Sequence, residues 1–363
     1  MISYIIPTRD RAERLAETLR AIEGLGPHQA EVVVADNASR VAVRVPRTLG
    51  SGLPVRLLEL GENLGAAARN VAVRESDSRA SWVVMLDDDS HPLGLGFLGS
   101  LASQPEDVAA VSADIFLPRH GRRESGGLPE VFIGCGVAIR RGAFLAAGGY
   151  DASFNYYAEE YDLAAKLLLA GHRVAFDPAF CVAHHKVEAG RDMNLICERL
   201  VRNNGWVMQR YAPQERRREE LREIRGRYRA IAEKERAIAG YSRGLVELRR
   251  TLRGQMRTPM PRELFDRFTG LSQARAAIAA AQREASFRTA AVVREGKNAW
   301  CVRTALAECG VREVTERDAE ALVIGTMSPG PMLDAAGALY GSGARVVMPW
   351  CEAKRATAIG RAA

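Results

Sequence analysis

The chain has 363 residues, of which 47% are hydrophobic and 26% charged, and this length and composition suit two or three globular domains. No apolar stretch reaches the roughly 18 residues that a membrane span needs, and the N-terminus runs directly into a predicted strand, so we expect neither a membrane span nor a signal peptide. None of the six cysteines has a C-x-x-C spacing, so we expect reduced thiols in a cytoplasmic protein. They are Cys135, Cys181, Cys197, Cys301, Cys309 and Cys351.

Strands alternate with helices in the first 90 residues. Short apolar runs predict four buried strands, at residues 1–6, 31–35, 55–60 and 81–86. A helix is predicted over residues 11–25, where Leu15, Leu19 and Ile22 have helical spacing, and another opens near residue 64. This alternation is typical of a parallel, doubly wound α/β sheet. Each strand ends in polar residues, which such a sheet brings to one edge, where ligands of these folds bind.

An acidic triplet, Asp87-Asp88-Asp89, follows the fourth predicted strand. Three adjacent carboxylates repel one another, so a fold that gathers them usually supplies a cation. Hard oxygen ligands suit Mg²⁺ or Mn²⁺, which commonly bridge to substrate phosphates. The alternative is a solvated acidic turn, because a charge cluster is often only surface.

Two glycine-containing segments follow the triplet. A helix that starts at Arg140 is predicted to end at Gly148-Gly149, which is either a plain C-cap or a hinge that turns Tyr150 and Asp151 toward an acceptor. Residues 118–129 contain three arginines and three glycines. They read either as a mobile loop that closes over donor phosphates or as a solvated loop.

Taken together and in order, these motifs resemble those of the family 2 glycosyltransferases, whose nucleotide-binding domain has the A-type (GT-A) fold, and this resemblance implies a doubly wound α/β sheet that is mixed rather than wholly parallel. The resemblance covers roughly residues 1–212. The motifs are Pro7-Thr8-Arg9, Val34-Ala35-Asp36-Asn37-Ala38-Ser39, Asn63-x-Gly65 through Arg69-Asn70, Leu86-Asp87-Asp88-Asp89, Gly148-Gly149-Tyr150-Asp151, Glu159-Glu160-Tyr161-Asp162-Leu163 and His184.

The resemblance implies a role for each motif. Asp36 would hydrogen-bond the nucleotide base, and Asp89 would bind Mn²⁺ or Mg²⁺ together with His184 or, as the alternative, His185. A lone His also has many uses other than metal binding. The remaining residues expected to bind the nucleotide sugar are Pro7, Thr8, Arg9, Asn37, Asn63, Arg69, Asp87 and Asp88.

The family pattern places a Glu-Asp pair before x-Asp-Leu, with the Asp as general base, whereas this chain has Glu159-Glu160. Glu160 occupies the position of the base and is one methylene longer. A carboxylate can still accept a proton within hydrogen-bond reach. Glu159, Asp162 and Asp151 are possible supporting residues, and we expect Asp162 to orient the loop or to cap a helix that begins at Leu163.

The implied activity is metal-dependent, inverting transfer of a hexose or deoxyhexose from a nucleotide-diphosphate sugar, most commonly a UDP-sugar, to a glycan or lipid-linked glycan. Alternatives are a nucleic-acid or small-molecule acceptor, or an inactive scaffold that binds sugar nucleotides. A sugar-1-phosphate nucleotidyltransferase would need a Gly-rich basic loop after the first strand, and Pro7-Thr8-Arg9-Asp10 is not one.

Residues 214–285 hold 18 Lys or Arg and 10 Asp or Glu, so this segment carries more than the whole net charge of +7. A heptad of Ile224, Ile231, Ile238, Leu245 and Leu252, interrupted by Gly240 and Gly244, predicts a helix, a bend and a shorter helix. The segment is either a solvated helix face or an arm that binds an anionic partner. Such an arm would bind nucleic acid or an anionic membrane surface, and binding to a membrane surface would make the protein peripheral to the membrane.

Residues 286–363 alternate again between strand and helix, which predicts a small α/β module. Its Gly-containing loop, residues 325–330, is too generic to count as a phosphate-binding fingerprint, so the sequence assigns it no chemistry. Such a small core is expected to pack on the helical segment or on a second subunit of a homo-oligomer. The predicted domains are therefore 1–212, 213–285 and 286–363.

Overall fold

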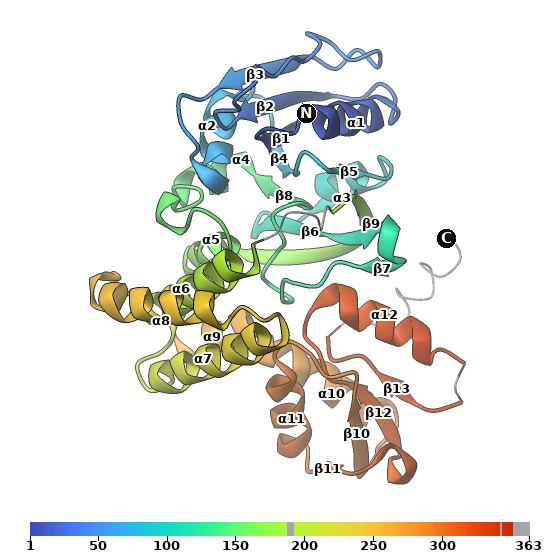
Figure 1. Ribbon diagram of the computed structural model, residues 1–363. Coiled ribbons are helices and arrows are strands. Elements are labelled where there is room, and N and C mark those ends of the chain that lie inside the picture. Colours follow the sequence, from blue (N-terminus) through green and yellow to red (C-terminus); the bar gives the residue numbers. More distant parts are fainter. Residues whose placement is uncertain (187–191, 342, 351–363) are drawn as a thin grey trace. The chain divides into compact units, whose positions relative to one another are not determined.

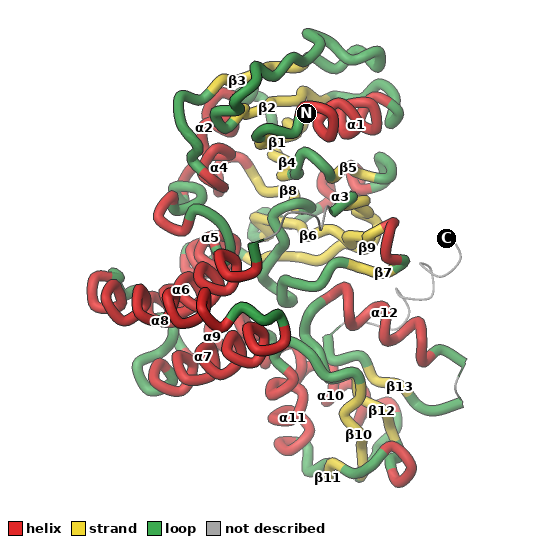
Figure 2. Tube along the Cα trace, in the orientation of Figure 1, coloured by secondary structure: helices red, strands yellow, loops and turns green. Residues whose placement is uncertain are grey.

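The computed structural model describes residues 1–186, 192–341 and 343–350, so Cys351 lies outside the described residues. The chain divides into two compact units, each built from three segments (Figures 1 and 2). The first unit contains residues 1–89, 139–172 and 186–265, and the second contains residues 90–138, 173–185 and those from 266 onward. Among the described residues, the five cysteines form no disulfide bond.

The first unit holds a parallel sheet of strand order β3-β2-β1-β4. Its strands are β1 (Ile2–Thr8), β2 (Ala30–Asp36), β3 (Val55–Glu59) and β4 (Trp82–Met85). Figure 1 shows α1 (Ala12–Glu23) and α2 (Ala68–Glu75) beside these strands, and a single helical turn, Gly65–Ala67, precedes α2. Both β2 and β4 are buried throughout, which explains the apolar runs 32–35 and 82–85 within them. The predicted parallel α/β arrangement is confirmed.

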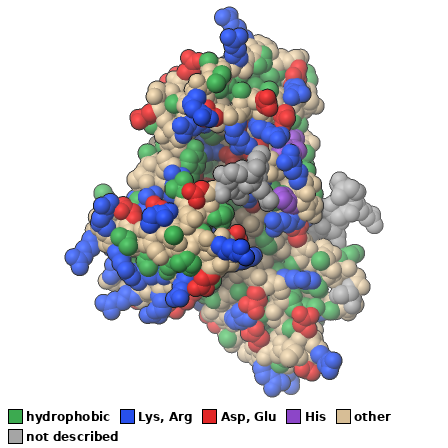
Figure 3. All heavy atoms as spheres, viewed as in Figure 1, with side chains coloured by type: hydrophobic (Ala, Val, Ile, Leu, Met, Phe, Trp, Pro, Cys, Tyr) green, Lys and Arg blue, Asp and Glu red, His purple; other side chains and the backbone are tan. Residues whose placement is uncertain are grey.

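The rest of the first unit is largely helical. Its helices are α4 (Arg141–Ala146), α5 (Glu159–Leu169), α6 (Met193–Tyr211), α7 (Arg217–Lys234) and α8 (Ile238–Thr251), with short turns at Ala152–Phe154 and Leu252–Gly254. The bend predicted in the basic segment lies between α7 and α8. In Figure 3, Lys and Arg side chains gather over these two helices. Among the described residues, no helix combines the length and apolarity needed to cross a membrane.

Small residues allow α8 to pack closely on α6. A Cβ atom on Gly240 would lie 1.9 Å from the carbonyl oxygen of Asn194, and one on Gly244 would lie 2.2 Å from that of Glu198. The heptad expectation was therefore wrong for α8, because Ile238 is exposed while Gly244 and Leu248 are buried. The glycines are the contact face of the helix rather than an interruption of it.

We expect Gly244→Ala to lower the free energy of unfolding by about 1–3 kcal/mol, because the added methyl group meets a backbone carbonyl that cannot move aside. The matched control is Gly226→Ala in α7, where nothing lies within 4 Å of the new Cβ. There the same substitution should stabilise the protein by up to about 1 kcal/mol through helix propensity. Urea denaturation of both variants measures the difference. Equal effects of the two substitutions would contradict the packing.

The second unit contains a mixed sheet in which β9 pairs in parallel with β6 and antiparallel with β5, while β7 pairs antiparallel with β6. The elements are β5 (Ser90–Pro92), α3 (Phe97–Ser103), β6 (Val108–Leu117), the turn Pro118–His120, β7 (Arg122–Arg123) and β9 (Arg173–His184). Strand β8 (Val137–Arg140) and helix α9 (Arg262–Thr269) each cross a boundary between the units. A mixed α/β sheet was the predicted fold class.

The C-terminal part of the second unit forms a separate parallel sheet of order β11-β10-β12-β13. Its elements are α10 (Leu271–Glu284), β10 (Thr289–Val293), α11 (Ala299–Glu308), β11 (Arg312–Glu313), the turn Glu316–Asp318, β12 (Ala321–Ile324), α12 (Pro329–Leu339) and β13 (Val346–Val347). The predicted small α/β module is confirmed.

The segment at residues 118–129 differs from the mobile loop that its arginines and glycines suggested. Arg123 donates to Asp114 at 2.8 Å and to Asp334 of α12 at 2.9 Å. The backbone N–H of Glu124 donates to the carbonyl of Ile115 at 2.8 Å. This segment is therefore fixed within the second unit by ion pairs and by pairing with β6.

Candidate active site

The polar residues after β1, β2 and β3 meet at one edge of the first unit's sheet, as predicted. Thr8 and Asp36 are direct neighbours in the β1/β2 ladder. The Asn37 side chain accepts from the N–H of Leu64 at 2.7 Å and donates to the carbonyl of Gly65 at 3.0 Å, which ties the loop after β2 to the start of α2. Register and side-chain bonds together fix this edge of the sheet.

The remaining residues predicted for the nucleotide pocket also lie at this edge. The Asn63 side chain accepts from the N–H of Gly65 at 3.0 Å. Asp36 is buried and accepts from both the N–H and the hydroxyl of Ser39, at 3.1 and 2.5 Å. Pro7 is half-buried and Arg9 is exposed. Arg9 is therefore the member of this set that solvent reaches most freely.

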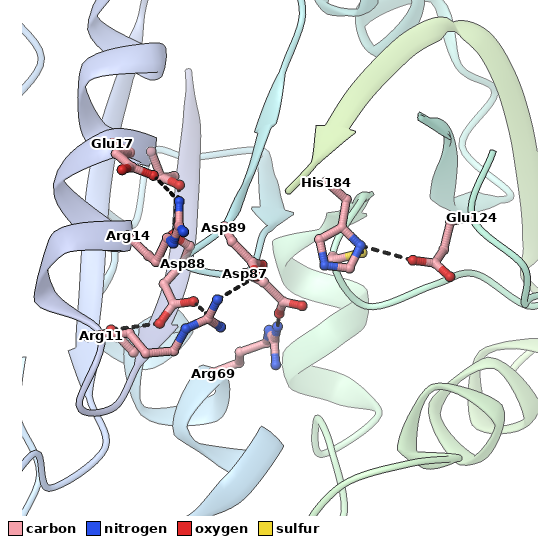
Figure 4. A network of polar contacts seen from close by, with 12 residues as sticks. Arg11, Arg14, Glu17, Arg69, Asp87, Asp88, Asp89, Glu124 and His184 are labelled. Atoms are coloured by element: carbon pink, nitrogen blue, oxygen red, sulfur yellow. Dashed lines mark hydrogen bonds and ion pairs between the residues drawn. The ribbon is translucent and has the colours of Figure 1, made fainter. Parts of the chain in front are cut away.

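The acidic triplet is paired with arginines of its own unit (Figure 4). Arg11, between β1 and α1, contacts Asp88 at 2.7 Å and Asp89 at 2.5 Å. Thr8 donates to the Asp88 carboxylate at 2.8 Å. Burial raises the pKa of Asp88 to about 7, although Arg11 and Thr8 favour its charged form. Within the first unit, the guanidinium group of Arg11 supplies positive charge beside Asp88 and Asp89.

Arg69 of α2 links the triplet to the rest of the edge. Its guanidinium donates to the carbonyl of Leu86 at 3.1 Å and forms an ion pair with Asp87. Burial alone would lower the pKa of Arg69, but the negative charge of Asp87 keeps it above its ordinary value. Glu159 also contributes to this upward shift, so Arg69 acts electrostatically on both the triplet and the start of α5.

Glu159 and Glu160 form the first turn of α5, and a strained loop leads into them. Tyr157 and Ala158 have φ angles of +73° and +67°, values that residues other than Gly rarely adopt. Asn203 of α6 holds this loop, because its amide donates to the carbonyls of Phe154, Tyr156 and Tyr157 at 3.0, 2.9 and 2.7 Å. Such strain persists only where the surroundings enforce it, and it is common at functional sites.

The two glutamates have different environments. Glu159 is buried, and its Oε2 has no hydrogen-bond partner, whereas Glu160 is half-buried. Burial, together with the charge of Glu160, raises the pKa of Glu159 well above its ordinary value. Burial of Glu159 therefore disfavours its ionised form. Two neighbouring carboxyl groups in such different environments are typical of acid–base sites.

We expect Glu159→Gln to remove a pH dependence of stability. A carboxyl group whose pKa is raised on folding stabilises the protein fully below its unfolded-state pKa of about 4.3 and loses that contribution as pH rises through the folded-state value. Gln cannot ionise, so the variant should gain stability relative to the wild type as pH increases. Denaturation at a series of pH values measures this difference. A constant difference from pH 4 upward would mean that Glu159 is ionised in the fold.

Asp162 does not cap a helix, in contrast to one of its expected roles. Helix α5 begins at Glu159, four residues before the predicted start at Leu163, so Asp162 lies inside its first turn. The Asp162 carboxylate accepts from Arg210 at 2.8 Å and from the Tyr211 hydroxyl at 2.7 Å. Arg210 also donates to Asp151 at 2.7 Å. The structure thus supports the other expected role, in which Asp162 orients the surrounding chain.

A pocket of about 740 Å³ lies alongside α5 in the first unit, and Asp151 and Arg210 are among the residues that line it. Lys166 and His172 add further polar groups, while alanines of α4 supply apolar surface. The pocket is therefore amphipathic. Among the predicted site residues, Asp151 is the one that reaches it.

In the second unit, His184 at the end of β9 faces a buried carboxylate (Figure 4). Its Nδ1 lies 3.0 Å from Oε2 of Glu124 and 3.6 Å from the Cys135 thiol. His185 instead stacks on His91, and their Nε2 atoms lie 3.3 Å apart. A carboxylate that fixes one ring nitrogen of a His is a common feature of metal-binding histidines. This arrangement favours His184 over His185.

Four residues of these networks, Arg11, Glu124, Asn203 and Arg210, were missed by the sequence analysis. Arg11 offered a signal, because a basic residue between a strand end and a helix lies at the same edge as the acids. The other three offered none, because their partners are 46 to 60 residues away in the sequence.

Comparison with known proteins agrees with the motif analysis. Residues 3–110 match the model of Glycosyl transferase family 2. The chain is 26% identical over 207 residues to the pre-mycofactocin glycosyltransferase of Mycobacterium tuberculosis, an alignment that covers 50% of this chain and 42% of the relative. It is 24% identical over 220 residues to an uncharacterized glycosyltransferase of Haemophilus influenzae, which covers 51% of this chain and 69% of that one.

Among solved structures, the mannosyltransferase PcManGT from Pyrobaculum calidifontis, in complex with GDP-Man and Mn²⁺, is similar at 18% identity and a TM-score of 0.44. The match covers 70% of this chain and 84% of the archaeal one. This chain spans less than half the length of its mycobacterial relative. The match to the model of Glycosyl transferase family 2 concerns residues 3–110 of this chain.

Proposed function

We propose that the protein is a metal-dependent, inverting glycosyltransferase that moves a sugar from a nucleotide-diphosphate sugar to an acceptor hydroxyl. The observation that carries the proposal is the arrangement of polar residues in the first unit. The strand ends of the family 2 domain gather Thr8, Asp36 and the acidic triplet, and Glu160 lies in the first turn of α5, directly after the strained loop. The edge binds the donor and the helix supplies the base. Asp36 binds the nucleotide base, and Asp87 and Asp88 bind the sugar nucleotide beside Arg69.

The residues present fit a divalent metal ion. Asp89 supplies a buried carboxylate, and His184 supplies an imidazole that Glu124 holds through Nδ1. A carboxylate that accepts the Nδ1 proton fixes the tautomer whose lone pair is on Nε2, the form that binds metals. Ser90, which follows Asp89 directly in the chain, is paired with His184 in the β5/β9 ladder. When bound, Mn²⁺ or Mg²⁺ would neutralise the diphosphate leaving group.

Glu160 is the general base. Its carboxylate accepts the proton of the acceptor hydroxyl, and attack in line on the sugar inverts the anomeric centre. Retention by double displacement would need a second ionised carboxylate as nucleophile. The neighbouring Glu159 is unsuited to that role because it is buried, and burial disfavours its ionised form. The difference in burial between Glu159 and Glu160 therefore supports inversion.

The acceptor we propose is a glycan or lipid-linked glycan, with UDP-sugars as the first donors to test. Residues 214–285, which include α7 and α8, carry the excess positive charge of the chain, and several arginines of these two helices, including Arg218, Arg222 and Arg249, are exposed. Exposed positive charge attracts anionic surfaces. Some of this charge is already paired, as in the Arg229–Glu233 contact at 3.0 Å.

We expect the protein to co-sediment with vesicles of anionic lipid at low salt and to dissociate at physiological ionic strength and above, where charges are screened beyond about 8 Å. A triple variant with Ala at Arg218, Arg222 and Arg249 should bind several-fold more weakly. Neutral vesicles are the control. Failure to bind anionic vesicles at low salt, together with a gel shift of duplex DNA, would redirect the arm to nucleic acid. If the protein binds neither anionic vesicles nor duplex DNA, these arginines belong to a solvated helix face.

Calorimetric titration of UDP, GDP and dTDP into the full chain, with Mn²⁺ or with EDTA, tests the proposed function. At least one nucleotide should bind, and EDTA should weaken its binding strongly. If none binds in the presence of Mn²⁺, the donor site is not where we propose it. Metal-dependent binding without any sugar transfer to a panel of acceptors would instead indicate an inactive scaffold.

A further inference from the structure

The C-terminal module, defined here as residues 286–350, is in direct contact with the β7 loop, residues 122–127, of the same unit. The Ser328 hydroxyl at the start of α12 accepts from the N–H of Gly126 at 3.1 Å and donates to the carbonyl of the same residue. Ser328 is buried. A Cβ atom on Gly330 would lie 2.3 Å from the carbonyl oxygen of Glu124. The first turn of α12 thus lies directly against the backbone of the β7 loop.

An ion-pair bridge adds to this contact. Asp334, one turn further along α12, accepts from the backbone N–H of Arg123 and from its guanidinium, both at 2.9 Å. The same guanidinium donates to the buried Asp114 of β6 at 2.8 Å. Arg123 is therefore held between α12 of the C-terminal module and strand β6. Bidentate, partly buried pairs of this kind fix geometry as well as adding stability.

The residue between these two contacts is Glu124. Its side chain is buried, with Oε1 accepting from the N–H of Ser125 at 3.1 Å and Oε2 lying 3.0 Å from Nδ1 of His184. The backbone on both sides of Glu124 is held by α12, through Asp334 before it and through Ser328 after it. The orientation of the His184 ring therefore depends on where α12 holds this loop.

We propose that the C-terminal module positions His184 for metal binding by fixing the loop that carries Glu124, with Ser328, Gly330 and Asp334 as positioning residues. This inference rests on the proposed function, in which His184 is a metal ligand. It gives a role to a module for which the sequence assigned no chemistry. Removal of a carboxylate that supports a metal-binding His typically costs about 10–100-fold in metal affinity.

The test measures binding of Mn²⁺ alone to the full chain, from the free-ion signal in electron paramagnetic resonance. Glu124→Gln should weaken binding by about 10–100-fold, and Gly330→Ala should weaken it in the same direction by at least several-fold, because the new methyl group displaces the Glu124 carbonyl. The matched control is Gly337→Ala in the same helix, where nothing lies within 4 Å of the new Cβ. That variant should bind Mn²⁺ as the wild type does.

The milder variant Asp334→Asn keeps the test decisive if Gly330→Ala fails to fold by circular dichroism. The double variant of Glu124→Gln and Asp334→Asn should bind no more weakly than Glu124→Gln alone, because both changes act through one residue. Folded Gly330→Ala and Asp334→Asn proteins with wild-type affinity, beside a weakened Glu124→Gln, would overturn the inference. Unchanged affinity in His184→Ala would instead overturn the proposed metal site.

Discussion

Glu160→Gln is expected to reduce turnover by at least about 100-fold and to leave nucleotide binding unchanged, because Gln keeps the size of the side chain but cannot accept a proton. Glu160 lies in the first turn of α5 and is half-buried. Steady-state rates with a donor that the wild type uses, together with a calorimetric titration of the nucleotide, measure the two effects separately.

Glu160→Asp is the matched variant, because it restores the residue that the family pattern has at this position. It should keep measurable activity, although a displacement of the carboxylate by about 1 Å can cost 100-fold. Near wild-type turnover in Glu160→Gln would contradict the assignment. Asp162 is then a poor substitute, since Arg210 and Tyr211 already occupy its carboxylate.

Asp89→Asn is expected to abolish the part of nucleoside diphosphate binding that depends on a divalent ion. The variant keeps the size of the side chain and removes the charge that would hold the ion. Its affinity for the nucleotide in Mn²⁺ should equal that of the wild type in EDTA. Calorimetric titrations of both proteins under both conditions give the comparison.

The control for Asp89→Asn is Asp10→Asn in the neighbouring loop, because Asp10 is an exposed acid that pairs with Arg40 at 3.0 Å. That change should leave the metal dependence intact. If Asp89→Asn retains the full response to Mn²⁺, the ligand is another acid of the triplet.

The sequence predicted the strands and helices well where the apolar pattern was strong. Runs such as residues 31–35 and 81–86 became the buried strands β2 and β4, because a parallel sheet covered on both faces needs continuous apolar residues. The polar residues at their ends follow from the same topology. Thr8 and Asp36 meet at one edge because parallel strands in register end together.

Packing partners could not be predicted in the same way. A heptad pattern suggested a seam through Ile238, but α8 packs through Gly240 and Gly244, because close approach of two backbones requires the absence of a side chain. The loop at residues 118–129 looked mobile from its arginines and glycines. In the fold, Arg123 finds Asp334, 211 residues away, and no local pattern encodes that contact.

The site shows the same division between local and long-range information. The triplet, Glu159-Glu160 and His184 were identified from local motifs. The groups that tune them, such as Glu124 beside His184 and Asn203 behind the α5 loop, come from distant segments. Their roles depend on burial and distance, which only the fold supplies.

The central claim is that the protein transfers a sugar from a nucleotide-diphosphate donor with the help of a divalent ion. The most direct measurement incubates the full chain with a panel of UDP-, GDP- and dTDP-sugars, in Mn²⁺ or in EDTA, and assays the nucleoside diphosphate released. Release from at least one donor in Mn²⁺, lost in EDTA and in Glu160→Gln when an acceptor is present, is the predicted result. Absence of release from every donor, with or without acceptors, or equal release in EDTA, would contradict it.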